Sequence, residues 1–235
     1  MDAKNDPIGQ AILDYASSKK SKDIVVSSDL CEDDTIPSAY LFRTYKEMPN
    51  LEKVALRHCS GNVLDIGAGA GCHAKYLQSK GLNVTALETS IGAVSYLQSI
   101  AIPAINSSIH TYTGATYDTL LLLMNGIGLA GNWSQLESFL LHLKTLLAPN
   151  GCIICDSTDI QYLYEEEDGS MWMDVSAEYY GNFKFQMRYN DHQTEWFDWL
   201  YVDVDRLSKV CSNVGLAIEM LYEDESHYLV KLSSL

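Results

Sequence analysis

The residues best suited to binding a ligand form a glycine-rich turn in the first third of the chain. The run from Val63 to Cys72 reads VLDIGAGAGC, an apolar strand with an acid at Asp65 and glycines at positions 67, 69 and 71. Glycine lets a backbone pass close to a ligand at the carboxyl edge of a parallel sheet, where open α/β folds bind. A dinucleotide turn of the GxGxxG type would need glycine at position 72, where this chain has cysteine.

The glycine turn lies within an alternation of strand-like and helical segments. Near-continuous apolar runs predict strands at 62–66, 83–88, 103–106, 117–124 and 151–157. Apolar residues at helical spacing predict helices between them, at 72–80, 92–99 and 134–147. Buried strands separated by helices imply a parallel sheet covered on both faces.

Two further regions flank or interrupt this core. Asp6 followed by Pro7 predicts a short N-terminal helix, and a second helix at 51–58 leads into the first core strand. We expect residues 1–50 to form a flank or lid and residues 51–235 to form the core. Alternating apolar and polar residues at 183–189, followed by 195–204, predict an antiparallel hairpin within an inserted cap at about 160–201. A helix at 205–214 and a last antiparallel strand pair complete the chain.

These residues and elements together resemble the class I S-adenosylmethionine-dependent methyltransferases. The resemblance implies a Rossmann-like, seven-stranded, mostly parallel sheet with an antiparallel last strand and a small antiparallel β insertion. It implies S-adenosylmethionine as cofactor, with the glycine turn around the methionine portion. The residues assigned to that turn are Asp65, Gly67, Ala68, Gly69 and Gly71.

The ends of the next three strands supply the other residues that the resemblance assigns to the cofactor. Glu88 ends the second strand, where the family binds the ribose hydroxyls, and Thr89 follows it. Ser108 stands where the family often has an aspartate for the adenine amino group, and Ile109 would pack on the ring. The fourth strand runs into Met124 and Asn125, which would lie near the sulfonium. Asn125 could orient an acceptor or cap a turn.

Arg43 is the residue of the N-terminal flank to which the resemblance gives a role. It lies 22 residues before Asp65, and glycine N-methyltransferase-like proteins hold the cofactor carboxylate with an arginine at a similar remove. A guanidinium can meet a carboxylate with two parallel hydrogen bonds. A solvated surface arginine is the alternative.

Methyl transfer from a sulfonium is a direct in-line displacement, so the protein mainly aligns and desolvates the two reactants. A base is needed only if the acceptor must lose a proton. Asp156 and Asp159 follow the fifth strand and are the carboxylates nearest to that position. They could serve as catalytic bases or cap the following turn.

The composition limits the partners of the chain. Sixteen basic residues against 31 acidic ones give a formal net charge of −15, which disfavours nucleic acid and leaves a small-molecule acceptor, cationic or aromatic, as the expectation. The acidity could attract a cationic acceptor or could simply form a solvated surface that aids solubility. The insertion carries aromatic residues that could line an acceptor pocket or pack the cap on the sheet: Tyr162, Tyr164, Trp172, Tyr179, Tyr180, Trp196, Trp199 and Tyr201. Cysteines and histidines share no metal-ligand spacing, so no metal site is predicted.

The sequence leaves two other functions open. A nicotinamide-dependent oxidoreductase shares the strand, glycine turn and helix, although position 72 argues against it. A non-catalytic module that binds S-adenosylmethionine would share the fold. No apolar run is long enough to span a bilayer and the start lacks a secretory signal, so we expect a cytoplasmic protein without membrane contact. The residues predict no particular oligomeric state.

Overall fold

The structure is a computed structural model that describes residues 5–164 and 178–235. Its main sheet has seven strands among these residues, in the order β11-β12-β7-β6-β3-β4-β5. The strands are β3 (Asn62–Ile66), β4 (Asn83–Glu88), β5 (Ala104–Asn106), β6 (Tyr117–Leu122), β7 (Leu147–Thr158), β11 (Leu216–Asp224) and β12 (His227–Ser234). Neighbours from β5 to β7 pair parallel, whereas β12 is antiparallel to both β7 and β11. The predicted fold class is confirmed.

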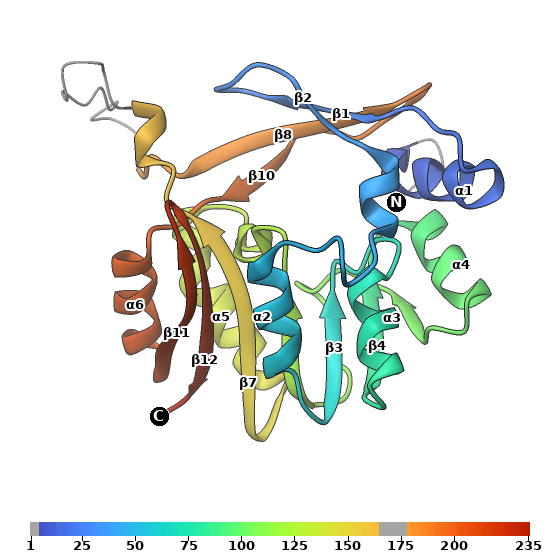
Figure 1. Cartoon of the computed structure of the whole chain (residues 1–235). Coiled ribbons are helices and arrows are strands. Elements are labelled where there is room, and N and C mark those ends of the chain that lie inside the picture. The colour runs from blue at the N-terminus through green and yellow to red at the C-terminus, as the bar shows by residue number, and fades with distance from the viewer. Residues whose placement is uncertain (1–4, 165–177) are drawn as a thin grey trace.

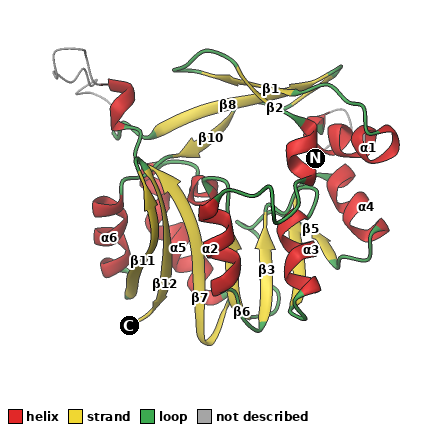
Figure 2. Ribbon diagram, in the orientation of Figure 1, coloured by secondary structure: helices red, strands yellow, loops and turns green. Residues whose placement is uncertain are grey.

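Helices cover both faces of this sheet (Figures 1 and 2). On β3, Val63 points to one face and Leu64 to the other, because successive strand residues alternate. Val63 packs with α2 (Asn50–His58) and α3 (Cys72–Ser79), and Leu64 packs with α5 (Leu136–Thr145) and α6 (Val204–Asn213). Short 3-10 helices occupy the connections: η2 (Ser38–Phe42), η3 (Gly126–Ala130), η4 (Trp133–Gln135) and η5 (Gln161–Tyr164). No helix in the described residues is long and apolar enough to cross a membrane.

A second, antiparallel sheet lies across the carboxyl ends of the parallel strands (Figure 1). Its order is β10-β8-β1-β2, with β9 paired to β8. The strands are β1 (Ile24–Ser28), β2 (Asp34–Ile36), β8 (Asn182–Tyr189), β9 (His192–Gln193) and β10 (Phe197–Leu200). The predicted hairpin is therefore present as β8 and β10. β10 ends earlier than the predicted strand, because Asp203 caps α6 by accepting from the Arg206 N–H at 2.9 Å.

The N-terminal flank supplies two of the five described strands of this second sheet, β1 and β2, which the sequence did not predict. β1 pairs with β8 of the insertion, with Val26 opposite Met187 and Ser28 opposite Phe185. The flank and the insertion are thus one structural unit that covers the edge of the core.

The N-terminal helix α1 (Pro7–Ser18) is fixed to α4 (Ile91–Ser99) through Asp6. As predicted, Asp6 caps α1, and its Oδ1 accepts from the Gly9 N–H at 2.9 Å. Its Oδ2 accepts from the Ser90 hydroxyl at 3.0 Å and from the Gly92 N–H at 2.9 Å. The helices approach so closely that a Cβ on Gly92 would lie 2.7 Å from the Gly9 backbone.

Because Asp6 caps one helix and joins it to another, we expect Asp6→Ala to lower the free energy of unfolding by about 1–3 kcal/mol. Urea denaturation would measure the change. Asp23→Ala removes an exposed aspartate from the same flank and should change stability by less than about 0.5 kcal/mol. Equal stabilities of the two variants would show that the Asp6 contacts do not hold α1 in place.

Candidate functional site

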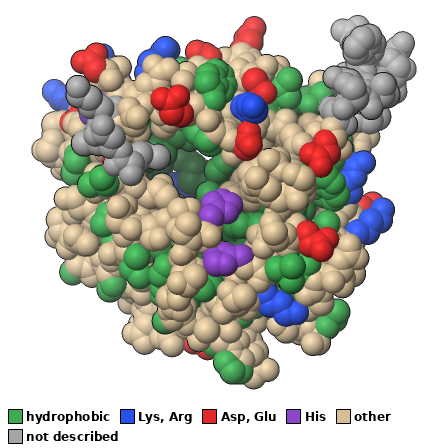
Figure 3. All heavy atoms as spheres, turned by 180° about the vertical axis from the view of Figure 1, so that it is seen from behind, with side chains coloured by type: hydrophobic (Ala, Val, Ile, Leu, Met, Phe, Trp, Pro, Cys, Tyr) green, Lys and Arg blue, Asp and Glu red, His purple; other side chains and the backbone are tan. Residues whose placement is uncertain are grey.

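A cavity of about 540 Å³ lies between the glycine turn and the second sheet. This volume falls in the range of roughly 300–1,000 Å³ that is typical of small-molecule sites. One wall comes from the turn after β3 and the ends of β4 and β6, and the opposite wall comes from β1, β2, β8 and β10. Figure 3 shows a hollow with hydrophobic side chains inside it, on the face opposite to that of Figure 1.

The glycine turn presents open backbone to this cavity. Gly67, Gly69 and Gly71 have φ values of +74°, +54° and +75°, which L side chains rarely adopt. A Cβ on Gly69 would meet no protein atom within 4 Å, whereas one on Gly71 would lie 2.5 Å from Leu97 Cδ2. Gly69 therefore leaves room for a ligand, and Gly71 allows helix packing. Ala68, between Gly67 and Gly69, also lines the cavity.

Glu88 ends β4 as predicted and lines the same cavity. Its Oε2 accepts from the Gly69 N–H at 2.9 Å. Its Oε1 accepts from the N–H groups of Thr89 at 2.7 Å and Ser90 at 3.0 Å. The carboxylate thus joins the glycine turn to the start of α4, and Oε2, which accepts only one hydrogen bond, keeps lone-pair capacity for a ligand hydroxyl. Thr89 contacts Glu88 and does not line the cavity.

Asp65 brings an unsatisfied acceptor to the cavity. The residue is 2% exposed, and its Oδ2 has no hydrogen-bond partner among the described residues. Burial raises the pKa of this carboxyl, and the nearby His73 partly counteracts the shift. Because a buried acceptor without a partner is costly, a ligand that donates a hydrogen bond at this position would be favoured.

Arg43 also lines the cavity but is already paired with a carboxylate. Its Nε and Nη2 donate to the two oxygens of Glu52 at 3.0 and 2.7 Å, and both side chains are buried. Glu52 also contacts His73 Nε2 at 3.1 Å. Burial lowers the pKa of His73, but Cys72, Glu52 and Asp65 outweigh it and raise the pKa to about 10. The two-bond fork is thus directed at Glu52, and contact of Arg43 with a ligand carboxylate stays a prediction.

Met124 and Asn125 line the cavity in a strained turn, with φ values of +67° and +55°. Asp156 holds this turn, because its two oxygens accept from the N–H groups of Asn125 and Gly126, both at 2.9 Å. Burial raises the pKa of Asp156 to about 6, and these two N–H groups only partly offset the rise. Asp156 does not line the cavity. Asp156 therefore holds a turn that precedes it in the chain rather than the following turn, and its role as a catalytic base stays a prediction.

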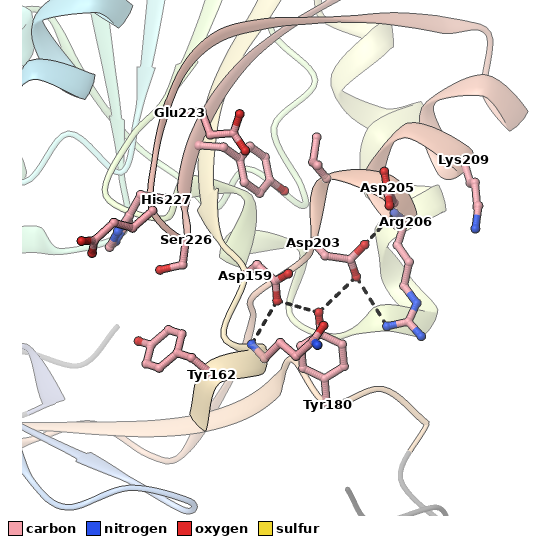
Figure 4. A pocket seen from close by; sticks show the side chains of 14 residues that line it. Asp159, Tyr162, Tyr180, Asp203, Asp205, Arg206, Lys209, Glu223, Ser226 and His227 are labelled. Atoms are coloured by element: carbon pink, nitrogen blue, oxygen red, sulfur yellow. Dashed lines mark hydrogen bonds and ion pairs between the residues drawn. The ribbon is translucent and has the colours of Figure 1, made fainter. Parts of the chain in front are cut away.

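Asp159 likewise has a capping role. Its Oδ1 accepts from the Gln161 N–H at 3.0 Å and from the Tyr180 hydroxyl at 2.8 Å. Figure 4 shows this network, which continues through Asp203 to Arg206 and lines a different cleft of about 630 Å³. Neither predicted catalytic carboxylate faces the cavity beside the glycine turn.

Ser108 and Ile109 also lie outside the cavity lining. The Ser108 Oγ accepts from the His110 N–H at 3.3 Å, which caps a local turn. Ile109 is 4% exposed and packs in the main core. Contact of these two residues with an adenine ring stays a prediction.

The predicted aromatic residues divide between the two roles left open. Tyr162, Trp199 and Tyr201 line the cavity. Tyr164 and Tyr179 pack against Tyr180, with ring centroids 6.0 and 4.5 Å from it. Trp196 is 48% exposed, and Trp172 lies outside the described residues.

Several lining residues were not singled out from the sequence. They are Val26, Glu32 and Asp34 of the flank, Phe183, Phe185, Met187 and Phe197 of the insertion, and His227 of the β11–β12 turn. The alternation of FKFQMRY could have indicated the face that carries Phe183, Phe185 and Met187. The flank residues gave no comparable signal, because their place depends on pairing with a distant strand.

A solved relative shows the family to which the chain belongs. A methyltransferase from Bacteroides fragilis, described as S-adenosylmethionine-dependent and solved in complex with S-adenosyl-L-homocysteine, is 39% identical over 100% of this chain and 97% of its own, with a TM-score of 0.93. The chain is a class I S-adenosylmethionine-dependent methyltransferase. This finding confirms the predicted cofactor and decides against the nicotinamide-dependent oxidoreductase.

More distant structures share the fold. The CcbJ methyltransferase from Streptomyces caelestis is 14% identical over 80% of this chain and 97% of its own, with a TM-score of 0.62. A sugar N-methyltransferase from a Streptoalloteichus species is 13% identical. The match covers 78% of this chain and 85% of the sugar N-methyltransferase, with a TM-score of 0.54. No protein-family model and no curated protein matches the chain.

Alanine at Gly69 and at Gly71 should strain the backbone alike, since both have a positive φ, but should differ in the effect on cofactor binding. In Gly69→Ala the methyl group enters the open space, so adenosylhomocysteine should bind about tenfold more weakly or worse, a change of ~1.4 kcal/mol or more. Gly71→Ala should mainly lower the melting temperature, because its Cβ collides with Leu97. Calorimetry and thermal melts would measure the two effects. Unchanged affinity in folded Gly69→Ala would place the cofactor elsewhere.

Proposed function

We propose that this methyltransferase transfers a methyl group to a small-molecule acceptor bound beneath the second sheet. The observation that carries the proposal is that the glycine turn and an aromatic wall line one cavity. A cofactor at the turn would therefore have an acceptor on the wall within the same enclosed space. The acidity of the chain supports a cationic acceptor over a nucleic acid, and the aromatic wall suits an aromatic acceptor.

The lining residues fit the chemical groups of the cofactor. Asp65 Oδ2 is a buried acceptor that suits the methionine ammonium, and the Glu88 carboxylate suits the ribose hydroxyls. The open space at Gly69 allows the cofactor to approach the backbone. When bound, S-adenosylmethionine supplies a methyl group on a positively charged sulfur.

The remaining residues of the cavity align the acceptor. Phe183, Phe185 and Tyr201 form a contiguous wall, with ring centroids 5.3 to 6.3 Å apart. Such a wall excludes water and restricts the acceptor to few orientations, which favours in-line attack. Asn125 Oδ1 accepts from the Thr158 hydroxyl at 2.6 Å, so the amide N–H groups of Asn125 are left to donate to a ligand.

A transfer assay tests the proposal directly. The protein is incubated with methyl-labelled S-adenosylmethionine and a metabolite extract, and we expect label in compounds that pass an ultrafiltration membrane. Phe185→Ala should lower kcat/KM for that acceptor by about tenfold, because the wall loses its central ring, and leave adenosylhomocysteine affinity unchanged. Trp196→Ala removes an exposed ring of the same insertion and serves as control. Label confined to protein or nucleic acid would contradict the proposal.

Arg43 can be tested with two ligands that differ at the carboxylate. Arg43 Nη1 also donates to the Tyr40 carbonyl at 2.9 Å, which leaves one N–H of Nη1 for the cofactor carboxylate. If this N–H binds the carboxylate, Arg43→Lys should weaken adenosylhomocysteine binding by about tenfold or more, because the shorter-reaching ammonium loses that charge-assisted hydrogen bond. 5′-Methylthioadenosine lacks the amino-acid group and should bind the wild type and the variant alike. Glu52→Gln disturbs the same buried pair without removing Arg43, and so controls for structural damage. Parallel losses for both ligands would mean that Arg43 only supports the fold.

A further inference from the structure

The turn between β6 and η3 lies where the core meets the second sheet. Met124 and Asn125 form this turn and line the cavity beneath the second sheet. They also line a neighbouring pocket of about 590 Å³, which Asp156 lines as well. In η3, which follows the turn, a Cβ at Gly128 would collide with the indole ring of Trp199 on β10. The turn is therefore packed between the end of the core sheet and the wall opposite the cofactor.

The backbone of this turn is in a conformation that its sequence does not favour. Met124 has a φ of +67° and Asn125 has a φ of +55°, both in the left-handed region. Asparagine adopts this region more readily than most residues, but methionine rarely does. Such strain persists only where the surrounding contacts enforce it, and it is concentrated at functional sites. The contacts that enforce it here therefore identify residues on which the function of the turn depends.

The carboxylate of Asp156 is the first of these contacts. It is 5% exposed, and its two oxygens accept from the backbone N–H groups of Asn125 and Gly126, both at 2.9 Å. It forms no ion pair among the described residues. Burial and, to a smaller extent, the charge of Glu52 raise the pKa of Asp156. A buried acid without a cationic partner is costly, so stability alone does not favour its presence beside a strained turn.

The hydroxyl of Thr158 is the second contact, and it holds the side chain of the same asparagine. Thr158 ends β7, two residues beyond Asp156, and is 3% exposed. Its hydroxyl donates to Asn125 Oδ1 at 2.6 Å. With the backbone and the amide oxygen both held, the amide NH₂ of Asn125 has a fixed direction. It makes no hydrogen bond to another described residue. A fixed donor without a protein partner, in the lining of a cavity, suits an acceptor atom of a ligand.

We propose that Asp156 and Thr158 are positioning residues for methyl transfer, an inference that rests on the proposed function. They act through Asn125, whose amide NH₂ donates to a lone pair on an oxygen or nitrogen of the methyl acceptor, next to the atom that is methylated. That atom forms the bond to the methyl carbon while the carbon–sulfur bond breaks and its electron pair stays on sulfur. Asp156 takes up no proton in this role, which differs from that of the catalytic base predicted from the sequence.

A double-mutant cycle tests whether Thr158 acts through Asn125. The initial rate of methyl transfer is measured with saturating labelled S-adenosylmethionine and the metabolite extract, for Thr158→Val, Asn125→Ala and the variant that carries both. Valine keeps the branched shape of threonine and removes the hydroxyl. We expect each single variant to lose about tenfold in rate, because a misaligned acceptor reacts slowly. The double variant should lose no more than Asn125→Ala alone, because the hydroxyl then has no amide to hold.

A second cycle, with the same measurement, tests Asp156. Asp156→Asn places an NH₂ group against one of the two N–H groups that the carboxylate accepts from, and should lose about tenfold in rate. In the Asn125→Ala background it should add less than about a twofold loss. Thr119→Val removes a buried hydroxyl from β6 that bonds to Ser60, and should leave the rate unchanged. Adenosylhomocysteine affinity, measured by calorimetry, should change by less than about threefold in every variant.

The outcomes separate this inference from the proposed function. Losses that multiply to about a hundredfold in the double variants would mean that the two residues act independently of Asn125, and would overturn the inference. An unchanged rate in folded Thr158→Val would overturn it too, as would a loss of adenosylhomocysteine affinity as large as the loss of rate. Thermal melts identify a variant that does not fold, and if Asp156→Asn fails, the Thr158 cycle decides. Rates are taken from all label transferred, so label confined to macromolecules would overturn the proposed function while the cycles still test the positioning residues.

Discussion

The pairing of β1 with β8 is the interaction on which the site depends. It joins the N-terminal flank to the insertion, and Lys184 donates its N–H to Asp29, 155 residues away, at 2.9 Å. Without this pairing, β1 and β2 would have no fixed position relative to the aromatic residues of β8 and β10. The wall opposite the glycine turn exists because these two distant segments form one sheet (Figure 2).

The two sheets have different tasks. The core sheet holds two turns whose geometry is set by hydrogen bonds from backbone N–H groups to carboxylate side chains. Glu88 fixes the glycine turn at Gly69, and Asp156 fixes the strained turn at Asn125. The glycine turn suits a cofactor common to a whole family. The second sheet carries side chains on a regular grid, and such a surface can change its specificity by substitution without altering the core. We therefore expect cofactor binding and acceptor choice to respond to mutations in separate parts of the chain.

The sequence predicted what depends on local patterns. The positions of β3, of the glycine turn after it and of Glu88 at the end of β4 agree with the sequence prediction, because hydrophobic periodicity and motif spacing are local signals. The pairing of β1 with β8 could not be predicted, because no residue pattern in either strand specifies which distant strand it pairs with. For the same reason, the Glu52 partner of Arg43 and the turn held by Asp156 appeared only in the structure.

A crystal structure of the protein with adenosylhomocysteine would test most directly the claim that one cavity serves cofactor and acceptor. The account predicts the amino-acid end at Asp65 and Gly69, the ribose at Glu88, and the sulfur facing open space before Phe185 and Tyr201. Adenosylhomocysteine in the cleft around Asp159 and Arg206, or a ligand that fills the space up to the aromatic wall and leaves no room for an acceptor, would contradict it.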